Sequence, residues 1–75
     1  MKASFQLTAV FEEAPEGGYI CYIEEIPGVN SQGDTLEEAK ANLAEALELI
    51  LETQRMLTRK EVENKNVIRE NLELV

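Results

Sequence analysis

Hydrophobic and polar positions alternate at the start of the chain and fall at helical spacing later. From Ala3 to Phe11 every second residue is apolar, which predicts a strand with one face toward a core. One Pro and two adjacent Gly between positions 12 and 18 predict a hairpin loop, and a second strand is expected from Gly18 to Glu25. Both alternating sets of this second strand are bulky, so we expect it to be central and covered on both faces.

The next segment changes from strand to helix within a few residues. A Pro-Gly pair at positions 27–28 predicts a turn, and Gly33 predicts a backbone of positive φ, which leaves a short third strand between them. Thr35 and Glu38 stand at capping-box spacing. In that motif the Thr hydroxyl accepts from the amide of Glu38, and the Glu38 carboxylate accepts from the amide of Thr35. A helix is therefore predicted to begin at Leu36.

Apolar residues then recur by threes and fours as far as Leu51, with acidic residues opposite, which predicts an amphipathic helix of about five turns. Residues 54–57 could continue it, or Thr58 and Glu61 could cap another short turn. The charged segment 59–66 is typical of a connector.

The last segment, Val67 to Val75, alternates again and predicts a closing strand. The expected order is β-β-β-α-β. This is an α+β fold formed by a single domain over residues 1–75, with one long helix on one face of a small sheet.

Composition and charge narrow the range of partners. A 75-residue domain buries only about 60% of its unfolded surface, so self-association into a homodimer or higher oligomer is expected to supply further burial. Seven Lys and Arg against fifteen Asp and Glu give a net charge of −8. This charge repels phosphate backbones and attracts basic partners, so no direct nucleic-acid binding is expected.

The chain lacks the residues that several kinds of site require. The chain has one Cys and no His, so it offers no internal disulfide, no zinc-ligand set and no catalytic triad. We expect no cofactor and no enzymatic activity. No apolar run is long enough to span a bilayer and no signal-peptide pattern is seen, so we expect a cytoplasmic protein without membrane attachment.

The abundant carboxylates suggest one enzymatic alternative, a metal-dependent nuclease. Its metal would be held by a cluster of acidic residues, namely Glu24, Glu25, Asp34, Glu37 and Glu38. The spacing supports this poorly, because Glu24 and Glu25 are adjacent on a strand and point to opposite faces, while Glu38 is explained as a cap.

Two surfaces are candidates for binding a partner. The helix carries an acidic stripe, which is either a solvated face or a strip for a basic partner. The face of the sheet away from the helix carries apolar side chains, as interfaces between proteins do. The candidate partner-binding residues are Glu45, Glu48 and Glu52 on the helix, and Val10, Ile20 and Tyr22 on the sheet.

A series of short motifs lies between positions 16 and 46. These motifs are Glu16-Gly17-Gly18-Tyr19, Ile26-Pro27-Gly28, Ser31-Gln32-Gly33-Asp34-Thr35, Glu37-Glu38-Ala39, Asn42-Leu43 and Glu45-Ala46. Together they resemble the HicB family of antitoxins over about residues 3 to 53. The resemblance implies a partial ribonuclease H-like fold without that nuclease's full acidic site. It also implies that the chain neutralises HicA, a small basic RNA-cleaving toxin of a type II toxin-antitoxin system, by covering its active surface. Longer family members append a DNA-binding segment, which is not evident here. The alternative is a stand-alone homo-oligomer of the same fold, structural or regulatory in role, without a toxin partner.

Overall fold

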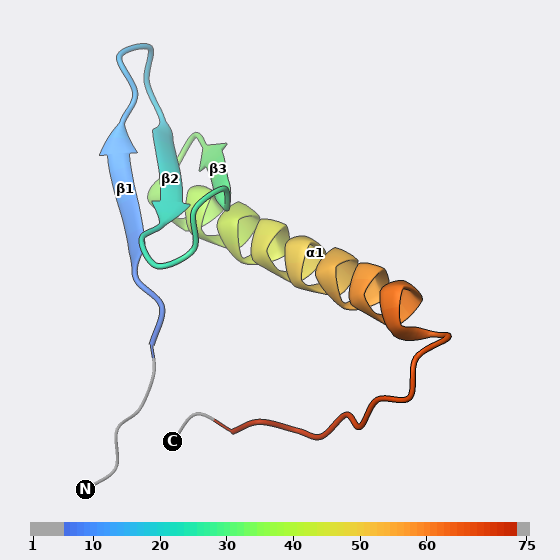
Figure 1. Cartoon of the computed structure of the whole chain (residues 1–75). Helices are drawn as coiled ribbons and strands as arrows, with labels where there is room; N and C mark the ends of the chain where they lie inside the picture. Colours follow the sequence, from blue (N-terminus) through green and yellow to red (C-terminus); the bar gives the residue numbers. More distant parts are fainter. Residues whose placement is uncertain (1–5, 74–75) are drawn as a thin grey trace, which may run out of the picture.

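The computed structural model describes residues 6–73, which form one antiparallel sheet and one long helix (Figure 1). Strands β1 (Ala9–Glu13), β2 (Tyr19–Ile23) and β3 (Asn30–Gly33) are followed by helix α1 (Leu36–Val62). The strands form a meander in the spatial order β1-β2-β3, and α1 packs across one face of the sheet. The predicted α+β class is confirmed, and so is the order of the first four elements.

β1 occupies a later stretch of sequence than the alternation predicts. It begins at Ala9 rather than Ala3 and continues two residues past Phe11, because Glu12 and Glu13 still pair with β2 across the hairpin. Residues 6–8 precede the strand, and residues 1–5 lie outside the described part of the chain.

β2 is the central strand, as predicted, but only one of its faces is covered. Cys21 and Ile23 are buried against α1, whereas Ile20 and Tyr22 on the other face are 43% and 42% exposed. Coverage of one face by the helix is confirmed, whereas coverage of the other face by a second subunit stays a prediction. The described part of the chain leaves this apolar face of the sheet open to solvent.

The core lies between β2 and the first half of α1. It contains the buried side chains of Cys21, Ile23, Val29, Ala39 and Leu43. The Cys21 thiol donates to the carbonyl of Ala39 across 3.4 Å, so even the one polar group in this core has a partner. Such a small core explains why the helix and sheet must approach each other closely.

Gly33 is needed for that close approach, and not for the positive φ that the sequence suggested. Among the described residues, positive φ is confined to Gly17, Gly18 and Gly28. A Cβ atom on Gly33 would lie 2.5 Å from the backbone nitrogen of Ala39, where real Cβ atoms are not found. The prediction for Gly28 is confirmed, with φ +92 in the turn before β3.

The helix begins at Leu36, as predicted, but half of its capping box differs. The Thr35 hydroxyl accepts from the amide of Glu38 at 3.1 Å, as expected. The Glu38 carboxylate instead accepts from the amide of Asp34 at 3.2 Å, one residue before the cap. The Glu38 side chain therefore holds the end of β3 as well as the start of the helix.

α1 is longer than predicted. It runs to Val62, so residues 54–61 continue one helix and form neither a second capped turn nor the start of a connector. Its first turn is acidic and its last turn basic, which suits the helix dipole. From Leu51 to Glu61 every residue is exposed, and Figure 1 shows this half of the helix extending past the sheet.

The predicted closing strand is not formed by residues 67–73, and residues 74–75 lie outside the described part. A strand needs an edge to pair with, but a helix of 27 residues carries the chain about 40 Å along its axis before this segment begins. Ile68 and Leu72 are left 90% and 86% exposed. The ribonuclease H-like assignment, which relies on this strand, stays a prediction.

Candidate functional site

β3 forms one open edge of the sheet. The amide of Ile23 donates to the carbonyl of Val29 at 3.1 Å, and hydrogen-bonded pairs alternate along antiparallel strands. By this alternation the backbone N–H and C=O groups of Ser31 and Gly33 point toward β2, whereas those of Asn30 and Gln32 point away from it. Such an edge is a template for the strand of another chain.

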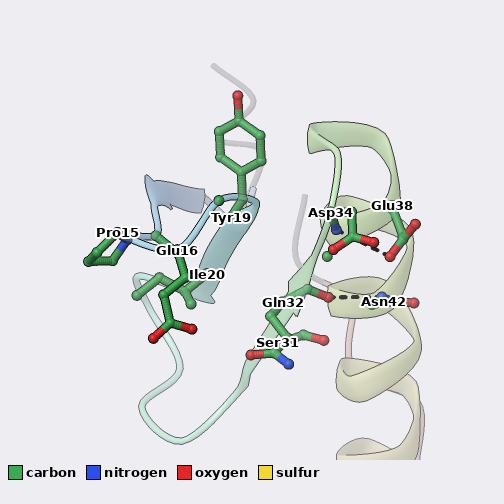
Figure 2. Close-up of a pocket in the computed structure, with 12 residues that line it drawn as sticks. Pro15, Glu16, Tyr19, Ile20, Ser31, Gln32, Asp34, Glu38 and Asn42 are labelled. Atoms are coloured by element: carbon green, nitrogen blue, oxygen red, sulfur yellow. Dashed lines mark hydrogen bonds between the residues drawn. The ribbon is translucent and has the colours of Figure 1, made fainter.

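One polar contact ties this edge to the helix. The side-chain amide of Asn42 donates to the carbonyl of Gln32 across 2.9 Å, as Figure 2 shows. This leaves the backbone groups of Asn30 and the amide of Gln32 directed outward. The sequence placed Asn42 in a family-like motif but gave it no role in the site. The available signal was an Asn inside an otherwise favourable helical pattern, where this residue type is a poor helix former.

A groove runs along the helix beside this edge, and we call it the acidic groove. It is lined by Ser31, Asn42, Glu45, Ala46, Glu48, Leu49 and Glu52. The three predicted acidic residues are thus brought together in one hollow, spaced by three and four along α1. Leu49 lies among them and is 68% exposed, which gives the groove an apolar centre between carboxylates.

A second hollow continues from the acidic groove past the end of β3 and shares Ser31 and Asn42 with it. It is lined by Ala14, Pro15, Glu16, Gly17, Tyr19, Ile20, Ser31, Gln32, Gly33, Asp34, Glu38 and Asn42. Figure 2 shows the hairpin residues on one side of it and Asp34 with Glu38 on the other. The Glu38 carboxylate accepts a hydrogen bond from the Asp34 amide, so its role is structural.

The predicted apolar sheet residues form a separate surface. The strand register places Val10 directly opposite Tyr22, and Ile20 points to the same face two residues before Tyr22. This face lies on the side of the sheet away from α1. The structure therefore groups the six predicted partner-binding residues into two surfaces, of which only the groove is acidic along its length.

Charge is divided along the chain. Residues 6–52 contain eleven Asp or Glu and a single Lys, whereas residues 53–73 contain five Lys or Arg and four Glu. The sheet and the first half of the helix thus carry eleven of the fifteen carboxylates, and residues 6–52 have a net charge of −10. A basic partner is attracted to this half of the molecule.

The carboxylates considered for a metal site are dispersed. The Glu25 carboxylate accepts hydrogen bonds from the hydroxyl and from the amide of Thr8, both at 2.7 Å. These bonds, the one from the hydroxyl more than the one from the amide, lower the pKa of Glu25 below its usual value. Across residues 6–73 no group of three or more potential ligands is positioned to hold a metal ion. In the same part of the chain no helix is both long enough and apolar enough to cross a membrane.

The fold and the groove define a small α+β domain with an open sheet edge and an acidic binding surface. Residues 6–57 match the model of the UPF0150-like family, and the chain belongs to that family. It is 56% identical over 52 residues to a UPF0150 protein of Synechocystis sp., covering 69% of each chain. A second UPF0150 protein of that organism is 40% identical over 52 residues, covering 69% of this chain and 66% of its own.

A third relative, a UPF0150 protein of Thermotoga maritima, is 46% identical over 46 residues, covering 60% of this chain and 61% of its own. The chain thus spans less than two thirds of the length of two of these three relatives. No solved structure matches the chain. The whole acidic groove lies inside the family match, while the end of the helix and the segment after it lie outside.

Proposed function

We propose that the chain is an antitoxin-like protein-binding module of the HicB kind, which neutralises a small basic RNA-cleaving toxin by covering its RNA-binding surface. The observation that carries this proposal is the acidic groove beside the open edge of β3. The HicB-like motifs between positions 16 and 46 support it, and they line much of the same surface.

Electrostatics favour such a partner. A protein that cleaves RNA needs cationic side chains to bind phosphates, and those side chains are attracted by Glu45, Glu48 and Glu52. Complementary charge speeds association and suppresses wrong partners. The same charge repels RNA itself, so the module would compete with RNA for the toxin without binding the substrate.

Shape and hydrogen bonding support the same site. The outward backbone groups of Asn30 and the outward amide of Gln32 can pair with a strand of the partner, a mode of recognition that gives affinity through main-chain bonds. Leu49 can bury apolar surface at the centre of the groove, where binding energy concentrates. Carboxylates around it would supply the polar rim.

A ribonuclease assay tests the proposal. Purified chain added to a small basic HicA-like toxin is expected to abolish RNA cleavage, and the double variant Glu45→Lys with Glu48→Lys is expected to lose this inhibition. Glu61→Lys is the matched control, because it lies on the same helix outside the groove and is exposed. Equal inhibition by all three proteins would refute a role of the groove.

The outer sheet face favours a second candidate, a stand-alone homo-oligomer of structural or regulatory role. Ile20 and Tyr22 expose apolar surface that a second copy could cover. On this account Ile20→Lys abolishes self-association, and no basic protein encoded beside the chain binds it. Binding of such a protein at the acidic groove would exclude this alternative as the main function.

A further inference from the structure

The segment after the helix has no strand pairing over its described residues, and it carries two cations, Lys65 and Arg69, and two carboxylates, Glu70 and Glu73. We call residues 64–73 the tail. It contains Lys65, Val67, Ile68, Arg69 and Leu72, and has neither Gly nor Pro. Val and Ile favour extended backbone, and Val67, Ile68 and Leu72 are 46%, 90% and 86% exposed. The tail thus has strand-favouring residues at positions 67 and 68, beside three Asn, and over the described residues it has none of the pairing of a strand.

In the single copy the tail lies along the side of its own helix that faces away from the acidic groove. Ile68 and Arg69 share a shallow hollow with Leu51 and Arg55. Leu51 is two positions from Leu49 and therefore about 200° around the helix from the centre of the acidic groove. The tail and the groove of one chain do not meet in the structure.

The start of the tail is also too short to place Val67 over Leu49 of the same chain. Val62, the last residue of α1, lies 13 positions beyond Leu49, which is about 20 Å along the axis. The five residues from Val62 to Val67 span at most about 17 Å when fully extended. They are not extended, because the amide of Lys65 donates to the carbonyl of Val62 at 2.9 Å. A tail whose Val67 lies over Leu49 must therefore come from another molecule.

We infer that the tail of a second copy docks in the acidic groove and adds a strand to the open edge of β3. Both acidic residues of the tail come after Arg69, and over residues 65–69 the charge pattern matches that of the groove at the right spacing. Alternate residues of a strand share a face, so Lys65, Val67 and Arg69 point the same way, with the two cations about 13 Å apart. The groove presents carboxylates from Glu45 to Glu52 over about 10 Å.

The apolar positions match as well. Val67 lies midway between the two cations of the tail, and Leu49 lies between the carboxylates of the groove. A docked tail therefore places Val67 over Leu49 and offers backbone groups to Asn30 and Gln32. Because each copy has one tail and one groove, a two-fold pair satisfies both at once.

This docking stands without the proposed function, but it has a consequence that rests on it. The second copy and a basic toxin would occupy the same groove, so they would exclude each other. Dilution, or a toxin in excess, would open the pair and free the groove. Self-association would then keep the groove covered until a toxin is present.

Charge reversal with sedimentation velocity tests the docking. The wild-type chain is expected to form a concentration-dependent dimer. The groove variant Glu45→Lys with Glu52→Lys, and the tail variant Lys65→Glu with Arg69→Glu, are each expected to dimerise at least about tenfold more weakly, because repulsion replaces attraction in both contacts. Glu61→Lys is expected to leave the dimer unchanged. Circular dichroism of each variant establishes that α1 is retained.

Mixing the two reversed variants is the decisive arm. In the mixed pair the acidic tail meets the basic groove and the basic tail meets the acidic groove, so a heterodimer of wild-type affinity is expected. Failure of the mixture to associate would overturn the inference, as would a monomer at every concentration. A dimer that resists both reversals but is lost with Ile20→Lys would assign self-association to the outer sheet face instead.

Discussion

The side-chain amide of Asn42 donates a hydrogen bond to the backbone carbonyl of Gln32 across 2.9 Å, joining the helix to the open edge of the sheet. This contact fixes the distance between β3 and the acidic stripe of α1, and so sets the width of the groove. It also occupies one outward-facing acceptor of the edge. A residue with no expected role in the sequence thus shapes the candidate site.

Replacing Asn42 by Ala is expected to lower the free energy of unfolding by about 1 kcal/mol, the usual net value of one hydrogen bond. Urea unfolding followed by circular dichroism measures it. The matched control is Lys40→Ala, an exposed residue of the same helix with no hydrogen bond to β3 in the structure. Equal stability of the two variants would show that the contact adds nothing to helix docking.

Gly33→Ala is expected to be more damaging than Gly28→Ala, although only Gly28 has a positive φ. The added methyl at Gly33 meets the backbone of Ala39, which costs about 1–3 kcal/mol or displaces the helix. At Gly28 nothing lies within 4 Å, so the cost is the backbone strain of about 1 kcal/mol. Denaturant midpoints of the two variants give the comparison, and the reverse order would contradict the close approach.

Thr35→Ala is expected to destabilise the chain by about 1 kcal/mol, because the amide of Glu38 loses its acceptor at the first turn. Thr58→Ala changes the same residue type inside the exposed half of α1, where Ala is the better helix former, and is expected to be neutral or slightly stabilising. Thermal unfolding of both variants measures the difference. Loss of stability in both would mean that the cap is not the cause.

The hydroxyl of Thr8, and to a smaller extent its amide, lower the pKa of Glu25 in the folded chain. Folding is therefore expected to favour the ionised form of Glu25. The stabilisation from this carboxylate is therefore present above its ordinary pKa of 4.5 and is lost as the pH falls through the folded value. In Thr8→Val only the amide donor remains, so the pKa of Glu25 rises toward 4.5. An NMR titration of the Glu25 carboxyl, with Thr8→Ser as the variant that keeps the hydroxyl, measures the change.

The sequence predicted those features that local chemistry determines. The start of the helix follows from the Thr35 cap, and the turn at Gly28 follows from its backbone freedom. The stripe of Glu45, Glu48 and Glu52 follows from helical spacing alone. Each of these depends on residues within a few positions of one another, so periodicity and residue type are enough.

The features it missed depend on contacts between distant segments. The need for Gly33 arises from the backbone of Ala39 across the helix-sheet interface. The role of Asn42 arises from a carbonyl ten positions earlier. The closing strand was predicted from alternation in the tail, but alternation does not show whether an edge lies within reach, and the length of α1 removes the tail from its own sheet.

The proposed function is tested most directly by calorimetric titration of the chain with a small basic HicA-like toxin, at low and at high salt. We expect tight binding at low salt, weaker binding at high salt, and loss of binding for Glu45→Lys with Glu48→Lys but not for Glu61→Lys. Absence of binding at low salt, or equal binding by the groove variant and the control, would contradict the claim that the acidic groove is the site of a basic partner.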